Sequence, residues 1–131
     1  MLAAEILYKG AIALADATSG YAQANDGTTI TIAAGDIFIG IVEETADNST
    51  GAAGDIKVRV IKHGEFQFTY NGGGLTQGNI GDKVYCNDTT GDGEVGALTG
   101  GVDVEVGEIV EIISATVCRV KIDNSIGSIA A

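Results

Sequence analysis

His63, Cys86 and Cys118 are the chain's only histidine and cysteines, and they are the residues that could supply a base and a nucleophile. A hydrolase of the serine or cysteine type needs a nucleophile, a base and an orienting group held together. His63 precedes Gly64 at a predicted hairpin turn, far in sequence from both cysteines, and no Gly-x-Ser-x-Gly elbow occurs. We therefore predict an exposed turn histidine, no catalytic residues and no enzymatic activity.

A second set of residues resembles a calcium loop. The first half of an EF-hand spacing is matched by Asp88, Thr90, Asp92 and Gly93. Thr99 stands where a bidentate Glu is needed, and the flanking segments resemble strands, which favours an ordinary polar turn. The alternative is a weak calcium ion held by Asp88, Asp92 and Glu94. Zinc is not expected, because the cysteines and the histidine are not closely spaced.

Two carboxylate pairs, Glu43 with Glu44 and Glu108 with Glu111, have the residue types for acid and base in glycoside hydrolysis. Such chemistry also needs a sugar-binding cleft, usually furnished with aromatic residues, and this chain has no Trp. Solvated surface acids are the better prediction. The glycine run 72–74 lacks the following Lys and helix of a phosphate-binding loop. We predict no cofactor-binding or metal-binding residues.

Charge narrows the range of partners. Eighteen acidic residues against seven basic ones give a formal net charge of −11. This field repels polyanions, so neither nucleic acid nor an anionic membrane is an expected partner. Basic residues alternate with apolar ones on two predicted strands, which is typical of a solvated or partner-facing surface; they are Lys57, Arg59 and Lys62, then Arg119 and Lys121.

The N-terminal apolar stretch 1–15 is interrupted by Glu5 and Lys9, and no basic region precedes it. We therefore expect no cleaved signal peptide, and no stretch is apolar for the 18 or more residues of a membrane helix. A protein made in a reducing cytosol is expected to keep Cys86 and Cys118 as buried free thiols. A disulfide between the two is the alternative.

The elements that would position these residues are strands. A phrase of Gly, an acid and alternating apolar residues recurs at Gly35-Asp36, Gly54-Asp55, Gly81-Asp82 and Gly107-Glu108. Each occurrence predicts a turn that launches a strand, with the acid accepting a hydrogen bond from a turn amide. Segments 56–62 and 65–70 are predicted to form a hairpin, in which Phe66, Phe68 and Tyr70 share a core-facing side.

With 131 residues, no proline and no long helical stripe, the chain is predicted to form one domain. The expected fold is all-β, a compact barrel or sandwich of about seven to nine short strands with little helix. Residues 28–123 are expected as the β core and 124–131 as a weakly patterned tail. Residues 1–27 form either an N-terminal arm or a sheet strand.

Several ordered phrases resemble the small decoration, or cement, proteins of tailed-phage capsids, a family catalogued largely as domains of unknown function. They span roughly residues 34 to 122: Ala34-Gly35-Asp36 with Gly40-Ile41-Val42, Gly51-Ala52-Ala53-Gly54-Asp55 with Val58, Lys62-His63-Gly64-Glu65-Phe66, Gln77-Gly78 with Gly81-Asp82-Lys83-Val84-Tyr85, and Arg119-Val120-Lys121-Ile122.

The resemblance implies a non-enzymatic virion protein, made in the host cytoplasm, that binds the major capsid protein on the outer surface of the head and stabilises the shell, often as a homotrimer. Residues 1–27, or the basic strand faces at Lys57, Arg59, Arg119 and Lys121, are then expected to contact the capsid or a sister subunit. The alternative is a β-sandwich binding module of a phage fibre or cell surface, with a glycan or calcium-dependent partner.

Overall fold

The computed structural model describes residues 1, 5–24, 32–87, 90, 93–123 and 128–129, and these form the predicted all-β fold. Among them there is no α-helix, only the single 3-10 turn η1 at Gln77–Asn79. The strands outnumber the seven to nine expected because several have only two or three residues: β1 Glu5–Leu7, β2 Ile12–Ala15, β3 Ala22–Ala24, β4 Ile37–Val42, β5 Ala46–Asn48, β6 Val60–Ile61, β7 His63–Tyr70, β8 Lys83–Asn87, β9 Glu94–Val95, β10 Asp103–Ser114, β11 Val117–Asp123 and β12 Ser128–Ile129.

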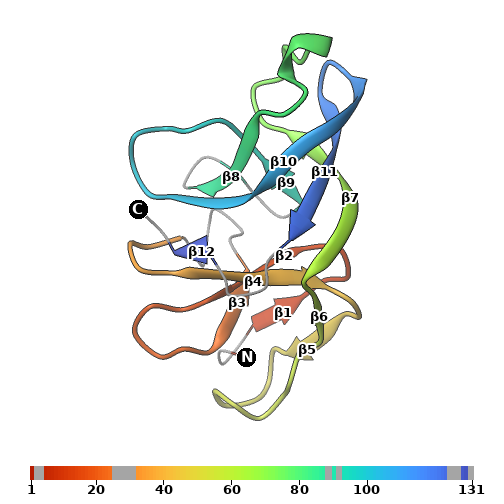
Figure 1. Ribbon diagram of the computed structural model, residues 1–131. Helices are drawn as coiled ribbons and strands as arrows, with labels where there is room; N and C mark the ends of the chain where they lie inside the picture. Colours follow the sequence, from red (N-terminus) through yellow and green to blue (C-terminus); the bar gives the residue numbers. More distant parts are fainter. Residues whose placement is uncertain (2–4, 25–31, 88–89, 91–92, 124–127, 130–131) are drawn as a thin grey trace.

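A nearly closed five-stranded barrel forms the upper half of the molecule in Figure 1. Its strand order is β8-β10-β11-β7-β9, with every pair antiparallel except the parallel pair of β7 and β9. Tyr85 of β8 and Gly96, just after β9, exchange two backbone hydrogen bonds of 2.8 and 2.9 Å. This bridge links the two end strands, so the barrel leaves little free edge.

Smaller sheets make up the lower half. One has the order β12-β4-β2-β3, with β6 also paired to β4, and β1 pairs with β5. Of the two alternatives for residues 1–27, an arm or a strand, the described residues 5–24 form strands β1 to β3. The β core therefore begins earlier than residue 28. The expected tail 124–131 contributes β12, which pairs with β4.

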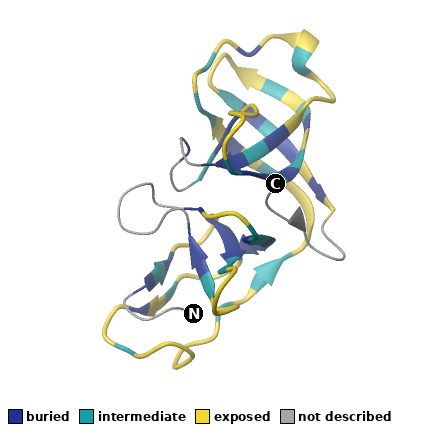
Figure 2. Ribbon diagram, turned by 90° about the vertical axis from the view of Figure 1, so that its left-hand side faces the viewer, coloured by how far each residue is buried: buried dark blue, intermediate teal, exposed yellow. Residues whose placement is uncertain are grey.

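The two halves share a hydrophobic core. One buried cluster joins Leu14 and Phe38 of the lower sheet to Val84, Ile109 and Val120 of the barrel. Figure 2 shows the buried strands of both halves facing each other. Phe68 is buried in this cluster, and Phe66 and Tyr70 pack against it, as the sequence predicted. A smaller cluster, which includes Met1, Leu7 and Val42, lies under β1 to β3.

The predicted hairpin of segments 56–62 and 65–70 is wrong. β6 pairs with β4, and β7 follows it at once and pairs with β11 and β9. His63 begins β7 instead of occupying a turn, and Gly64 has a φ of 138°, which a residue with a side chain rarely adopts. The chain therefore passes here from the lower sheet into the barrel without reversing direction.

Identical sequences, Ala-Ala-Gly-Asp, form the same turn at residues 33–36 and 52–55. The Asp amide donates to the first carbonyl, Asp36 to Ala33 and Asp55 to Ala52, at 3.1 Å in both turns. The carboxylate accepts in return from the first amide, at 2.9 Å in the first turn and 2.8 Å in the second. The predicted bond from a turn amide to the acid is therefore present in both.

The two turns differ in what surrounds them. Asp36 is fully buried and accepts two further hydrogen bonds, from the Ala17 amide at 2.8 Å and from Gln23 Nε2 at 3.0 Å. Asp55 is exposed, and no strand begins until Val60. At the fourth phrase, Gly107 and Glu108 lie inside β10. Only the phrases at Asp36 and Asp82 launch strands directly, β4 and β8.

Candidate functional site

His63 pairs with Asp123, its cross-strand neighbour at the end of β11. His63 Nδ1 lies 2.9 Å from Asp123 Oδ1, and both side chains are about two-thirds exposed, at 64% and 68%. The hollow beside this pair, of about 230 Å³, is lined by His63, Gly64, Glu65, Lys121, Ile122 and Asp123. Within the described part of the chain this lining holds no Ser, Thr or Cys, so a His–Asp pair is present without a nucleophile.

Both cysteines are free and buried, as expected. Cys86 lies on β8 and Cys118 on β11, and β10 separates these strands. Thr90 Oγ1 lies 3.8 Å from Cys86 Sγ. Burial raises the pKa of the Cys118 thiol, which keeps it protonated and unreactive at neutral pH. The cysteines therefore belong to the core of the barrel.

Of the calcium candidates, Asp88 and Asp92 lie outside the described residues. Thr99 donates to Asp103 through its amide and its hydroxyl, both at 3.1 Å from Oδ1. Asp103 is 5% exposed and also accepts from Asn87 Nδ2 at 3.0 Å, so it ties the loop before β10 to β8. Among the residues that the structure describes, no three His, Cys, Asp or Glu side chains gather as a metal site.

The paired carboxylates are exposed. Glu43 and Glu44 follow β4. Glu108 and Glu111 lie on the outer side of β10, and each of these two is opposite a basic residue of β11.

The glycine run 72–74 is a turn at the end of β7. Leu75, directly after it, is buried, and its amide donates to the Ala115 carbonyl at 3.0 Å. These residues therefore support the fold and the surface.

Sequence reasoning missed a surface that we call the charged face, made of Glu65, Lys83, Glu108, Glu111, Arg119 and Lys121. Cross-strand register places Glu65 beside Lys121, Lys121 beside Glu108, and Glu108 beside Lys83. A second row places Arg119 between Gln67 and Glu111, with Arg119 Nε 3.5 Å from Glu111 Oε1. Acid and base thus alternate across four strands. In the sequence this surface is indicated only by the charged residues that alternate with apolar ones along β11. Their arrangement can be interpreted only when the strands that pair with β11 are known.

A shallow hollow of about 220 Å³ lies above Gly107 at the charged face, with Lys83, Glu108 and Lys121 in its lining. On its rim Lys83 Nζ lies 3.2 Å from Glu105 Oε1, and this contact raises the pKa of Lys83. Lys121 and Asp123 line this hollow as well as the one beside His63, so the two adjoin. The arrangement is open and charged, suited to contact with another surface more than to enclosing a small molecule.

Gly107 sets how closely β10 and β11 approach. A Cβ added there would overlap the carbonyl oxygen of Lys121 and lie 2.9 Å from Val120 Cγ1. We expect Gly107→Ala to lower the free energy of unfolding by about 3 kcal/mol, because backbone must move to admit the methyl group. Urea unfolding measures it. The control is Gly78→Ala, where the nearest atom is 3.6 Å away and the change should stay within about 0.5 kcal/mol. Equal losses in the two variants would contradict this account.

The basic residues of the two predicted strands separate in the structure. Arg119 and Lys121 lie on the charged face. Lys57 and Arg59 are exposed on the segment before β6, and among the described residues neither has a carboxylate within 4.0 Å. The backbone carbonyl of Arg59 accepts from the Glu43 amide at 2.9 Å, which anchors the segment to the end of β4.

Comparison with protein-family models, with curated proteins and with solved structures finds no match to this chain. The resemblance to phage decoration proteins therefore stays a hypothesis. No helix in the described part of the chain has the length and apolar character to cross a membrane.

Proposed function

We propose that this protein is a non-enzymatic structural protein of a phage virion, which binds the major capsid protein on the outer surface of the head and stabilises the shell. The observation that carries the proposal is that the candidate chemical groups form no enclosed site in the described part of the chain, while charged side chains cover its exposed strands. Its His–Asp pair lacks a nucleophile among the described residues, its thiols are buried, and the hollows at His63 and at Gly107 are open. The ordered phrases from residue 34 to 122 supply the class of partner, and with it the expected homotrimer on the shell.

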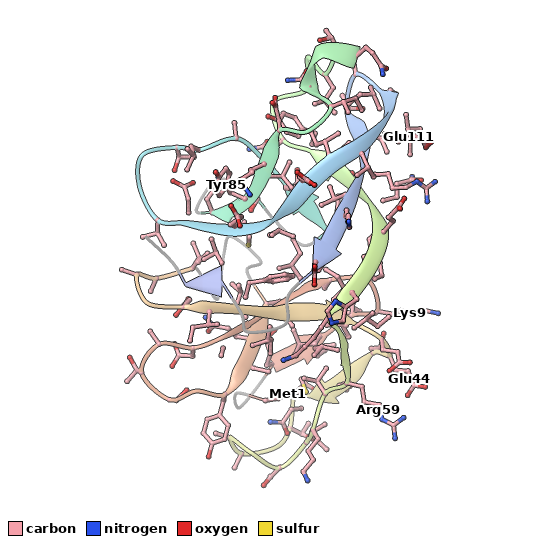
Figure 3. The ribbon with its side chains drawn as sticks, viewed as in Figure 1. Met1, Lys9, Glu44, Arg59, Tyr85 and Glu111 are labelled. Carbon is pink, nitrogen blue, oxygen red and sulfur yellow. The ribbon has the colours of Figure 1, made fainter. Side chains whose placement is uncertain are left out.

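We call three exposed cations of the lower half, Lys9, Lys57 and Arg59, the docking edge. In Figure 3, Lys9 and Arg59 project from the same side of the lower half, with Glu44 between them. The Lys9 amide donates to Thr45 Oγ1 at 3.0 Å, so its loop is held beside the end of β4. Exposed apolar side chains adjoin these cations in sequence, Tyr8 at 54% and Ile56 at 38%. Tyr and Arg are enriched at the centres of protein interfaces. The edge therefore suits a protein surface that carries carboxylates.

Charge reversal tests the docking edge. Lys57→Glu combined with Arg59→Glu is expected to weaken binding to undecorated phage heads at least tenfold, because two cations that face the partner become anions. Co-sedimentation with heads of the phage that encodes the chain measures it. Arg119→Glu makes the same type of change on the barrel and should bind as the wild type does.

Other outcomes of this experiment would contradict the docking edge or the proposed function. Loss of binding in Arg119→Glu but not in the docking-edge variant would move the contact to the charged face. If the unaltered protein does not bind heads, the proposed function is wrong. Binding of the unaltered protein to a glycan array, or a calcium-dependent partner, would favour the alternative binding module.

A further inference from the structure

The charged face complements itself. Across β7, β11, β10 and β8, its first row has the sign order minus, plus, minus, plus, from Glu65 through Lys121 and Glu108 to Lys83. When a second copy is rotated by 180° to face the first, its row lies over the first row in the reverse order, which is plus, minus, plus, minus. Every acid then meets a base. The second row behaves in the same way at its centre, where Arg119 and Glu111 exchange places.

We propose that two copies of this protein pair through their charged faces about a twofold axis that runs along β10 and β11, between the two strands. In this arrangement Lys121 of one copy meets Glu108 of the other, and Arg119 meets Glu111. Each contact occurs twice, as a twofold interface requires. These two kinds of pair lie nearest the axis, and the outer pair of Glu65 and Lys83 lies farther from it, because β7 and β8 flank the central strands.

Apolar side chains lie at one end of the same face. Ile113 is two residues beyond Glu111 on β10, and 44% of it is exposed. Val117, half-buried, is two residues before Arg119 on the outer side of β11, since Cys118, Val120 and Ile122 point into the core. Ser114 is the β10 residue opposite Val117, and Ile113 lies at the register shift just before it. The twofold axis that joins Arg119 to Glu111 therefore brings this end of β10, with the exposed Ile113, near Val117 of the second copy, adding apolar contact to the charge pairs.

The strength of the pairing depends on the salt concentration. Each copy carries a net charge of −11, so two copies repel each other at long range. At about 0.15 M salt the Debye length is about 8 Å, which screens this repulsion between whole molecules more than it weakens charge pairs in direct contact. Exposed ion pairs contribute little each, so the dimer is weak and reversible. It is expected at high protein concentration and moderate salt.

Sedimentation equilibrium of the complete protein, from about 10 μM to about 1 mM at moderate salt, tests the pairing. The expected result is a reversible species of twice the monomer mass of 13.3 kDa. Lys121→Glu should weaken association at least tenfold, because each Glu108 then faces an acid of the other copy, in both of the two symmetric contacts. Adding Glu108→Lys should restore association and returns the net charge to that of the wild type. Arg59→Glu, which changes the net charge as Lys121→Glu does but lies off this face, should leave association unchanged.

The exchanged variant also allows a mixing test. Lys121→Glu with Glu108→Lys pairs with itself but sets like charges against the wild type, so a mixture should form few mixed dimers. Thermal unfolding of each variant checks that the barrel is intact. A monomer at every concentration, or a dimer that Lys121→Glu leaves unchanged, would overturn the pairing. So would a trimer, which instead agrees with the resemblance. The inference does not rest on head binding, so either proposal can fail alone.

Discussion

Removing residues 1–15 is expected to abolish cooperative folding. The deletion takes away β1 and β2, and β2 lies between β4 and β3 in its sheet. It also removes Leu7, Ile12 and Leu14, none of which is more than 4% exposed. Burying one such side chain contributes about 1.5–3 kcal/mol, so three approach the roughly 5–15 kcal/mol that stabilises a typical domain. Circular dichroism during thermal and urea unfolding measures the result.

A point substitution separates this effect from loss of surface contacts. Tyr8→Ala, at an exposed position within the same segment, should leave the unfolding midpoint almost unchanged. A truncated chain that still unfolds in one sharp transition would show that residues 1–15 are dispensable, as a docking arm would be. For the same reason the truncated protein cannot test capsid binding, and substitutions at the docking edge are needed.

Asp36→Ala is expected to lower the free energy of unfolding by about 4 kcal/mol, because three donors lose their acceptor in a buried site. The Asp36 carboxylate accepts from the amides of Ala17 and Ala33 and from the Gln23 side chain, at 2.8 to 3.0 Å. These donors belong to three separate segments around β3 and β4. The loss therefore affects tertiary structure as well as one turn, and urea unfolding would measure it.

The chain contains a matched control. Asp55→Ala alters the same Ala-Ala-Gly-Asp turn at an exposed position, where the carboxylate accepts from Ala52. Its loss should cost about 1 kcal/mol or less, as for an exposed hydrogen bond. The difference between the two variants measures what burial and the two extra donors add. Similar losses would contradict the role given to Asp36.

Local patterns predicted much of the fold. The alternation of basic and apolar residues correctly predicted Arg119 and Lys121 on the outer side of their strand, opposite to the buried Cys118, Val120 and Ile122, because side chains on a strand alternate whatever the strand pairs with. Phe68 was predicted as a core residue on the same ground. The cysteines were predicted as buried thiols because Cys packs as a small apolar residue.

Strand pairing was not predictable in the same way. Segments 56–62 and 65–70 have the pattern of a hairpin, yet β6 and β7 belong to different sheets. A pairing depends on which distant strand offers a complementary face, and the sequence between two strands carries little of that information. For the same reason the sequence could not show that Lys57 and Arg59 lie in a different half of the molecule from Arg119 and Lys121, and all four were predicted as one kind of basic strand face.

The sequence by itself determined the all-β class, the inward and outward sides of the longer strands and the absence of a motif for nucleophilic or zinc chemistry, since these follow from residue type and short-range spacing. Only the tertiary structure decided that residues 5–24 belong to the core, that Asp36 is a buried acceptor while Asp55 is not, and that Lys121 stands between Glu65 and Glu108. Each of these depends on contacts between residues far apart in the chain, which form only when the sheets assemble.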